Sequence, residues 1–267
     1  HTGYGGNEVY ALNLQNITLT RLMNPSPLSD TINTRDPSCP TPASGPASPH
    51  SYDGFVFAPV NGKAYSFSNM GFCVSGEFFG NWLSEFDPLT NMWRRLAPFD
   101  TNVLNFPISV YDPVTKDIWV VPTGGTGGQR LNRFDPETGS FIGSSPNWGL
   151  WISASNAFLY NGEMYFPYKD IGKLVKVPLS TSVSGPTTVS TLPVGFGRQS
   201  GSAIRNGKVY FWNGNSTVTT YDFSADIWSE SVGGGVQVPT RNRGLVYSKW
   251  VYIPELDAFA GYHHPNE

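Results

Sequence analysis

Two apolar runs joined by a turn occupy residues 244–264, Gly-Leu-Val-Tyr-Ser-Lys-Trp-Val-Tyr-Ile-Pro-Glu-Leu-Asp-Ala-Phe-Ala-Gly-Tyr-His-His. Two more runs stand at the other end of the chain, residues 5–14 (Gly-Gly-Asn-Glu-Val-Tyr-Ala-Leu-Asn-Leu) and residues 18–23 (Thr-Leu-Thr-Arg-Leu-Met). Elsewhere in the sequence two such halves follow one another directly. A repeat divided between the chain ends closes a circular array, because pairing the ends removes the exposed sheet edges. The pattern therefore predicts a β-propeller.

The internal repeat has two halves, each with its own turn chemistry. The first half is a hairpin, and Asn-Gly at 61–62, 161–162 and 206–207 is the strongest short hairpin signal. The second half is a strand that ends in an aromatic-Asp-Pro turn, as at 86–88 and 134–136, followed by a strand that often carries Trp.

Aligning these turns predicts one all-β domain over residues 1–267, a five-bladed propeller, with six blades as the alternative. The last blade is expected to be shared by the N- and C-terminal strands, and a long loop insertion is expected at 25–53. The predicted blades cover 54–98, 106–144, 155–193, 201–232, and 244–267 together with 1–24.

The order of hairpin, Gly-rich stretch, strand, Tyr/Phe-Asp-Pro turn and Trp-bearing strand resembles the kelch repeat. Gly124-Gly125 and Gly5-Gly6 stand near the diglycine position of that family. Residues 1–12 and 48–54 are more narrowly similar to kelch-like propellers encoded by environmental bacteria and tailed phages. The resemblance implies a propeller fold and a phage virion component or secreted surface protein, located on the virion or outside the cell.

The composition argues against two classes of partner, nucleic acids and membranes. Charged residues make up 14% of the chain and the formal net charge is −3, so no basic footprint for nucleic acid is expected. There is no apolar run of about 18 residues and no signal-peptide pattern, so no membrane partner is expected. The chain starts with His1 rather than Met, which suggests a processed or partial product that has lost an upstream signal or domain.

Two cysteines are too few for a disulfide scaffold, but one bond between them is expected. The insertion that holds Cys39 leads directly into the blade whose following loop, 69–81, holds Cys73. A bond between them would pin the long insertion. The alternative is two buried thiols that lie near each other.

In a four-stranded blade with strands a to d, the b–c loops and the d–a connections open on the same end of the propeller. All four histidines and most unpaired large polar residues fall in these segments, which is where a rigid scaffold usually carries its site. The candidate binding residues are His1, Tyr4, His50, Tyr52, Trp148, Trp151, Tyr168, Arg198, Arg243, His263 and His264.

Residues expected at this end of the propeller are compatible with two kinds of catalysis. A polysaccharide lyase would need a base and a cation beside a uronate carboxylate, roles that His50, Tyr52, His263 and Arg243 could fill. A glycosidase would need inward carboxylates. The repeat uses Asp87, Asp135 and Asp222 in turns, which leaves as candidates Glu8, Asp53 and Asp170.

The sequence gives little support for metal or cofactor binding. The histidines lack a dedicated ligand spacing, so no metal and no cofactor is expected. Five tryptophans at repeat positions are expected to pack between blades, namely Trp93, Trp119, Trp212, Trp228 and Trp250. The sequence therefore favours a non-catalytic recognition or scaffold module that presents one loop-rich end to a glycan or protein, within a larger assembly. The alternative is a carbohydrate-active enzyme, foremost a lyase.

Overall fold

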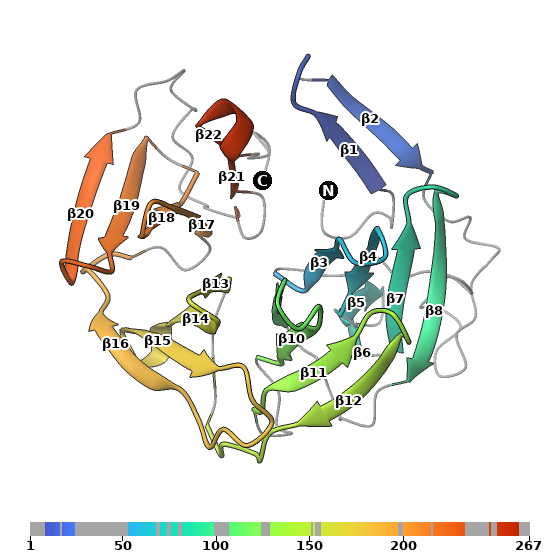
Figure 1. Ribbon diagram of the computed structural model, residues 1–267, viewed down its shortest axis with the longest axis horizontal. Helices are drawn as coiled ribbons and strands as arrows, with labels where there is room; N and C mark the ends of the chain where they lie inside the picture. Colours follow the sequence, from blue (N-terminus) through green and yellow to red (C-terminus); the bar gives the residue numbers. More distant parts are fainter. Residues whose placement is uncertain are drawn as a thin grey trace.

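The computed structural model describes most of the repeat units but not the long connections between them. The described residues are 9–16, 18–24, 53–67, 70–73, 76–79, 82–98, 107–123, 129–150, 152, 156–196, 200–214, 216–232, 246 and 250–261. They form an all-β protein in which antiparallel sheets stand around a common centre in a propeller-like arrangement (Figure 1).

Four of the sheets are four-stranded antiparallel meanders in which the first strand lies innermost. The first blade consists of β3 (Phe55–Ala58), β4 (Lys63–Ser66), β7 (Trp82–Asp87) and β8 (Met92–Pro98). The second consists of β9 (Ile108–Tyr111), β10 (Ile118–Val121), β11 (Asn132–Asp135) and β12 (Ser140–Ser144).

The third and fourth blades repeat this order. The third consists of β13 (Phe158–Tyr160), β14 (Glu163–Tyr168), β15 (Lys173–Pro178) and β16 (Thr187–Thr191), with a short 3₁₀ helix η2 (Lys169–Ile171) between β14 and β15. The fourth consists of β17 (Gly201–Arg205), β18 (Lys208–Trp212), β19 (Thr217–Asp222) and β20 (Ile227–Val232).

The expected count of five four-stranded blades is wrong for the described residues, which form four. The residues assigned to the shared blade form two separate two-stranded sheets. One pairs β1 (Val9–Asn13) with β2 (Thr18–Met23), and the other pairs β21 (Trp250–Ile253) with β22 (Ala258–Gly261) across the 3₁₀ helix η3 (Pro254–Leu256). The alternative of six blades is not supported either.

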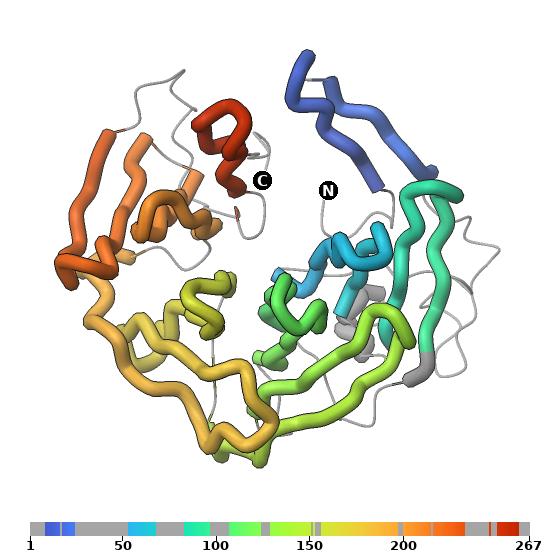
Figure 2. The backbone as a smooth tube through the Cα atoms, in the orientation of Figure 1, coloured from blue at the N-terminus to red at the C-terminus, as the bar shows by residue number. Residues whose placement is uncertain are grey.

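The two terminal hairpins are separate because each packs against a different neighbour. On one side, Val9, Leu22 and Met23 pack against the outer strands of the first blade. On the other side, the Trp250 ring lies 5.1 Å from the Trp212 ring of the fourth blade, and β21 lies beside β17. The tube in Figure 2 shows the hairpins at the two facing ends of the ring, β1–β2 in blue and β21–β22 in red.

One predicted loop contains strands of its own. Residues 69–81, between β4 and β7, include a hairpin of β5 (Met70–Cys73) and β6 (Gly76–Phe79). Cys73 ends β5, whereas Cys39 lies outside the described residues. No disulfide occurs within the part of the chain that the structure describes, so the Cys39–Cys73 bond stays a prediction.

Two of the three Asn-Gly pairs form the tight turn that the sequence predicts. Asn161 and Asn206 have positive φ, as do the glycines that follow them, and each pair is a two-residue loop between paired strands. Asn61-Gly62 differs because Pro59 fixes φ near −65° earlier in the turn. There the loop spans four residues, and the Gly62 N–H donates to Ala58 O at 3.0 Å.

The Asp-Pro turns share one hydrogen-bond pattern. In the second blade the Asp112 carboxylate accepts from Val114 N at 3.0 Å and from Thr115 Oγ1 at 2.8 Å. Lys116, with φ of 66°, then donates its N–H back to Asp112 O at 2.8 Å. The same arrangement recurs at Asp135, and at Asp222 the hydroxyl donor is Ser224, two positions on. Asp135 and Asp222 are therefore structural, as the sequence predicts, and Asp112 has the same role.

The core lies between the blades, so middle strands bury both faces. Ile118 and Val120 of β10 pack toward the first blade, whereas Trp119 and Val121 pack toward the third. This alternation explains why β10 reads as an unbroken apolar run. All five tryptophans expected to pack between blades are buried or half-buried, namely Trp93, Trp119, Trp212, Trp228 and Trp250.

Gly261 controls how the C-terminal hairpin attaches to the fourth blade. A Cβ at this position would meet Trp212 Cζ3, and it would stand 2.7 Å from Trp250 Cε3. We therefore expect Gly261→Ala to destabilise the protein by about 1–3 kcal/mol through overpacking. Urea unfolding monitored by tryptophan fluorescence tests this. Leu256→Ala, at an exposed position between the two strands of the same hairpin, should cost clearly less, and equal losses would contradict the packing argument.

Candidate functional site

Asp53 lies at the loop-bearing end, two positions before the innermost strand β3, whereas the candidate acid Asp170 lies in η2, in the β14–β15 loop of the same end. The Asp53 backbone pairs in parallel with Ile108 at the start of β9, and its carbonyl oxygen accepts a hydrogen bond from Ser109 Oγ at 2.8 Å. Its side-chain Oδ2 accepts from the Ala157 N–H at 2.5 Å, just before β13. Asp53 thus connects the inner strands of three blades.

The Asp53 side chain is almost fully enclosed, with 7% of the residue exposed. Burial raises the pKa of this carboxyl well above its usual value, and the Ala157 N–H opposes the shift only in part. A carboxyl in this state could serve as a proton donor, but its short hydrogen bond to the backbone also gives it a purely structural use.

Other polar groups at this end are buried without hydrogen-bond partners. Asn156, which precedes Ala157, is 1% exposed, and neither atom of its amide has a partner. Gln129 Oε1 is unpartnered too, while the Gln129 carbonyl accepts from Trp148 N at 2.8 Å. The roles of Asn156 and Gln129 are not predictable from the sequence, because nothing in a repeat pattern marks an unsatisfied amide.

Two of the eleven candidate binding residues fall within the described residues, and both are buried. Trp148 packs in the core between the second and third blades and donates its Nε1–H to Val183 O at 3.2 Å. Tyr168 ends β14 and joins the same core. Burial raises the pKa of its phenol, and the nearby Asp170 adds to the shift. Neither ring offers a ligand a broad surface.

The other nine candidate binding residues, which include the catalytic set proposed for a lyase, lie outside the described residues. Asp170 falls within η2 and is described, whereas Glu8 is not. The binding roles that the sequence suggests stay predictions for nine residues, namely His1, Tyr4, His50, Tyr52, Trp151, Arg198, Arg243, His263 and His264.

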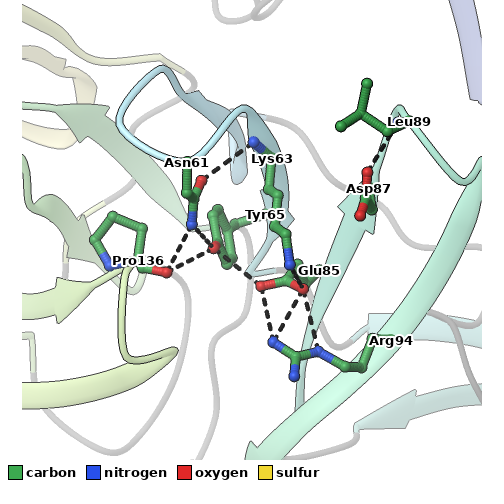
Figure 3. A network of polar contacts seen from close by, with 8 residues as sticks. All are labelled: Asn61, Lys63, Tyr65, Glu85, Asp87, Leu89, Arg94 and Pro136. Carbon is green, nitrogen blue, oxygen red and sulfur yellow. Dashed lines mark hydrogen bonds and ion pairs between the residues drawn. The ribbon is translucent and has the colours of Figure 1, made fainter.

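A second polar cluster, at the opposite end, was not foreseen from the sequence. Glu85 of β7 is 3% exposed and forms ion pairs with Lys63 Nζ at 2.7 Å and with Arg94 Nη2 at 3.0 Å. The Tyr65 hydroxyl lies 3.0 Å from Glu85 Oε2 and 2.9 Å from Pro136 O of the second blade (Figure 3). Asn61 Nδ2 donates to both the Tyr65 hydroxyl and Pro136 O.

A Glu, a Tyr, a Lys and an Arg in contact could form an acid–base site, but here the groups satisfy one another. Burial alone would raise the pKa of Glu85, yet hydrogen bonds from Lys63, Arg94 and Tyr65 outweigh it and hold the pKa below its usual value. Burial raises the pKa of the Tyr65 phenol, and the Glu85 charge raises it further. The cluster therefore holds a charged Glu85 and a neutral Tyr65 between two blades, which is a structural arrangement.

Related pairs recur in other blades, in each case around a tyrosine. In the third blade Glu163 accepts from the Tyr165 hydroxyl at 3.3 Å and from Lys176 Nζ at 2.8 Å. Burial, followed by the nearby Glu163 charge, raises the pKa of Tyr165 to about 12. The sequence carries a signal for this, a charged residue two positions before the tyrosine in Lys63-Ala-Tyr65, Glu163-Met-Tyr165 and Lys208-Val-Tyr210.

Glu85→Gln should destabilise the protein by about 2 kcal/mol at neutral pH, because a neutral amide cannot hold two cations. The pKa of Glu85 is lowered in the folded state, so its contribution is present above the ordinary pKa of Glu and is lost as pH falls through the lowered value. We therefore expect the difference between variant and wild type to shrink at about pH 3.

Urea unfolding at both pH values measures this difference. Glu137→Gln is the matched control, since Glu137 is exposed in the β11–β12 turn and its backbone N–H, not its side chain, makes the turn hydrogen bond. A loss for Glu85→Gln that does not change with pH would contradict the charged role of Glu85.

Among the described residues, no three His, Cys, Asp or Glu side chains come together as a metal-binding group. In the same part of the chain, no helix is long and apolar enough to cross a membrane.

Comparison with known proteins adds a fold likeness and little more. No protein-family model matches the chain, and no curated protein matches its sequence. Among solved structures, the chain is similar to "Structure of YjhT", with 14% identity over 74% of this chain and 68% of that one and a TM-score of 0.47.

The chain is also similar to the extracellular domain of the putative hybrid two-component system BT3049 from B. thetaiotaomicron. That likeness has 13% identity and a TM-score of 0.42, and it covers 67% of this chain but only 22% of that protein. At such identities the comparisons concern the arrangement of sheets alone.

Proposed function

We propose that this propeller is a non-catalytic recognition or scaffold module whose loop-bearing end contacts a glycan or a protein partner. The β-propeller fold is consistent with either use, since loops held by a rigid scaffold usually carry the binding residues.

The proposal rests on one observation: the polar groups that the structure describes hold turns and blades together. Asp53, the acid best placed for chemistry at the loop-bearing end, binds the Ala157 N–H and links blades. The repeat acids hold turns, and Glu85 is neutralised by two cations. Trp148 is packed into the core. Recognition is thereby assigned to the connecting loops, which the frame holds at one end.

The resemblance to kelch-like propellers of environmental bacteria and tailed phages supports a setting on a virion or a secreted surface, as one part of a larger assembly. In that setting the partner is a surface glycan or a neighbouring subunit. The rival function is a lyase of acidic polysaccharides that uses His50, Tyr52, His263 and Arg243.

A glycan array that includes uronate polysaccharides, probed with the whole chain, tests the proposal. We expect binding without release of unsaturated products. Trp151→Ala and Arg243→Ala, at positions that the sequence predicts to be in the loops of this end, should weaken that binding at least about tenfold, the loss expected when an aromatic or Arg anchor is removed. Leu89→Ala is the matched control, because Leu89 is 94% exposed in a turn at the opposite end.

Two results would overturn the glycan form of the proposal. Release of unsaturated products that stops in His263→Ala would establish the lyase. Failure to bind any glycan, together with chemical cross-linking of the loop-bearing end to a protein in the natural assembly, would replace glycan recognition with a scaffold role.

We also propose that the ring is completed by a kelch-type fifth blade, in which β22 pairs with β1. Apolar side chains that such a blade would cover are now exposed, namely Phe57 of β3 (50%), Val251 of β21 (47%) and Leu12 of β1 (46%). Hydrogen exchange tests this pairing. Every second amide of β1 bonds to β2, and closure would protect the intervening amides as well. Protection of alternate amides only would contradict closure.

A further inference from the structure

Three Asn-Gly pairs lie in the turn between the first two strands of a blade, at the end opposite the loops. They are Asn61-Gly62, Asn161-Gly162 and Asn206-Gly207. An asparagine followed by glycine is open to an intramolecular reaction, because no Cβ hinders the attack of the glycine backbone nitrogen on the preceding side chain. The three pairs share this chemistry but differ in their surroundings, so the fold decides which of them reacts.

The Asn161-Gly162 turn leaves both reacting groups free. Both residues are exposed, and a Cβ added at Gly162 would have no atom within 4 Å. Among the hydrogen bonds of the described residues, none involves the Asn161 side-chain amide or the Gly162 N–H. The strand ladder of this hairpin ends at the pair of Tyr160 and Glu163, outside the turn. The Gly162 nitrogen can therefore approach Asn161 Cγ without breaking a bond first.

The Asn61-Gly62 turn engages both reacting groups. Asn61 Nδ2, the nitrogen that would leave, donates to the Tyr65 hydroxyl at 2.7 Å and to Pro136 O at 2.8 Å (Figure 3). The Gly62 nitrogen, which would attack, donates its N–H to Ala58 O at 3.0 Å. Reaction at Asn61 therefore requires the loss of bonds that join the first two blades.

Two further pairs are more enclosed than Asn161-Gly162. Asn206 is exposed, but the glycine of Asn206-Gly207 is held in place. Its carbonyl accepts from Phe223 N at 3.2 Å, and a Cβ added to it would lie 3.6 Å from the Tyr160 hydroxyl. A fourth pair, Asn213-Gly214, lies at the loop-bearing end, where its glycine and its side-chain Oδ1 are both buried.

We propose that Asn161 is a site of spontaneous deamidation, from which the fold protects Asn61. The Gly162 nitrogen loses its proton to water or hydroxide and bonds to Asn161 Cγ, and the side-chain nitrogen leaves as ammonia. Water then opens the cyclic imide at one of its two carbonyls, which gives aspartate or isoaspartate. The net reaction converts an amide and water to a carboxylic acid and ammonia, so it needs no other reactant. This modification is independent of what the loops recognise.

Incubation of the whole folded chain in mildly alkaline buffer, followed by peptide mapping with mass spectrometry, tests the proposal. We expect Asn161 to convert at least about tenfold faster than Asn61, because two hydrogen bonds of the Asn61 amide nitrogen must break before reaction. Asn206 and Asn213 should both convert more slowly than Asn161, and isoaspartate should be among the products.

The same chain unfolded in urea is the matched control. There the four pairs differ only in their neighbours in sequence, so their rates should become similar. Tyr65→Phe removes one partner of the Asn61 amide nitrogen, and it should speed conversion at Asn61 severalfold while the rate at Asn161 stays the same. Asn161→Gly gives a Gly-Gly pair that suits the same turn, and it should remove the main acidic form seen by ion exchange.

The proposal fails if Asn61 converts as fast as Asn161 in the folded chain, or if Asn161 stays intact there while the unfolded chain reacts. It also fails if the four pairs keep their folded ranking in urea, because the local sequence would then set the rates. An unchanged rate at Asn61 in Tyr65→Phe would contradict protection by the contact between blades.

Discussion

The structure depends on a geometric constraint, that each blade has two apolar faces and can bury both only between two neighbours. The middle strands show this directly. In β14, Met164 and Phe166 pack toward the second blade, whereas Tyr165 packs toward the fourth. No blade is therefore a stable unit by itself, and the ring follows from the need to cover every face. The exposed Phe57 is what remains where a neighbour is missing from the described residues.

Polar side chains fix the position of one blade relative to the next, which the apolar packing alone does not. Apolar contact between sheets is non-directional and would tolerate sliding, whereas the hydrogen bonds of Tyr65 and Asn61 to a single carbonyl of the second blade allow one position. The Trp228 Nε1–H to Ser190 Oγ bond and the Trp250 Nε1–H to Tyr210 O bond serve the same purpose at later interfaces. Blade order thus comes from packing, and blade alignment comes from a few directional bonds.

The elements that could be predicted are those determined by a few consecutive residues. Asn161-Gly162 and the turn at Asp112 specify their backbone through the residues themselves, and the five repeat tryptophans mark the interfaces. Blade count could not be derived in the same way: the described residues form four complete blades, and a fifth depends on pairing β22 with β1 between the chain ends, which no local pattern determines. Trp148 shows a second limit. A tryptophan in a loop and one in a core look alike in sequence, and only the structure shows that Trp148 is 9% exposed and donates its Nε1–H to Val183 O.

The bond between Asp53 and Ala157 also has a consequence for folding kinetics. It closes a loop of 104 residues, compared with 14 between Leu131 and Ser145 within one blade. By loop-closure entropy, the longer loop costs about 2 kcal/mol more to form. The first and second blades both lie inside that loop, so their strands gain by assembling before the loop closes. We therefore expect the bond between Asp53 and Ala157 to form late in folding, after the strands of these two blades have paired.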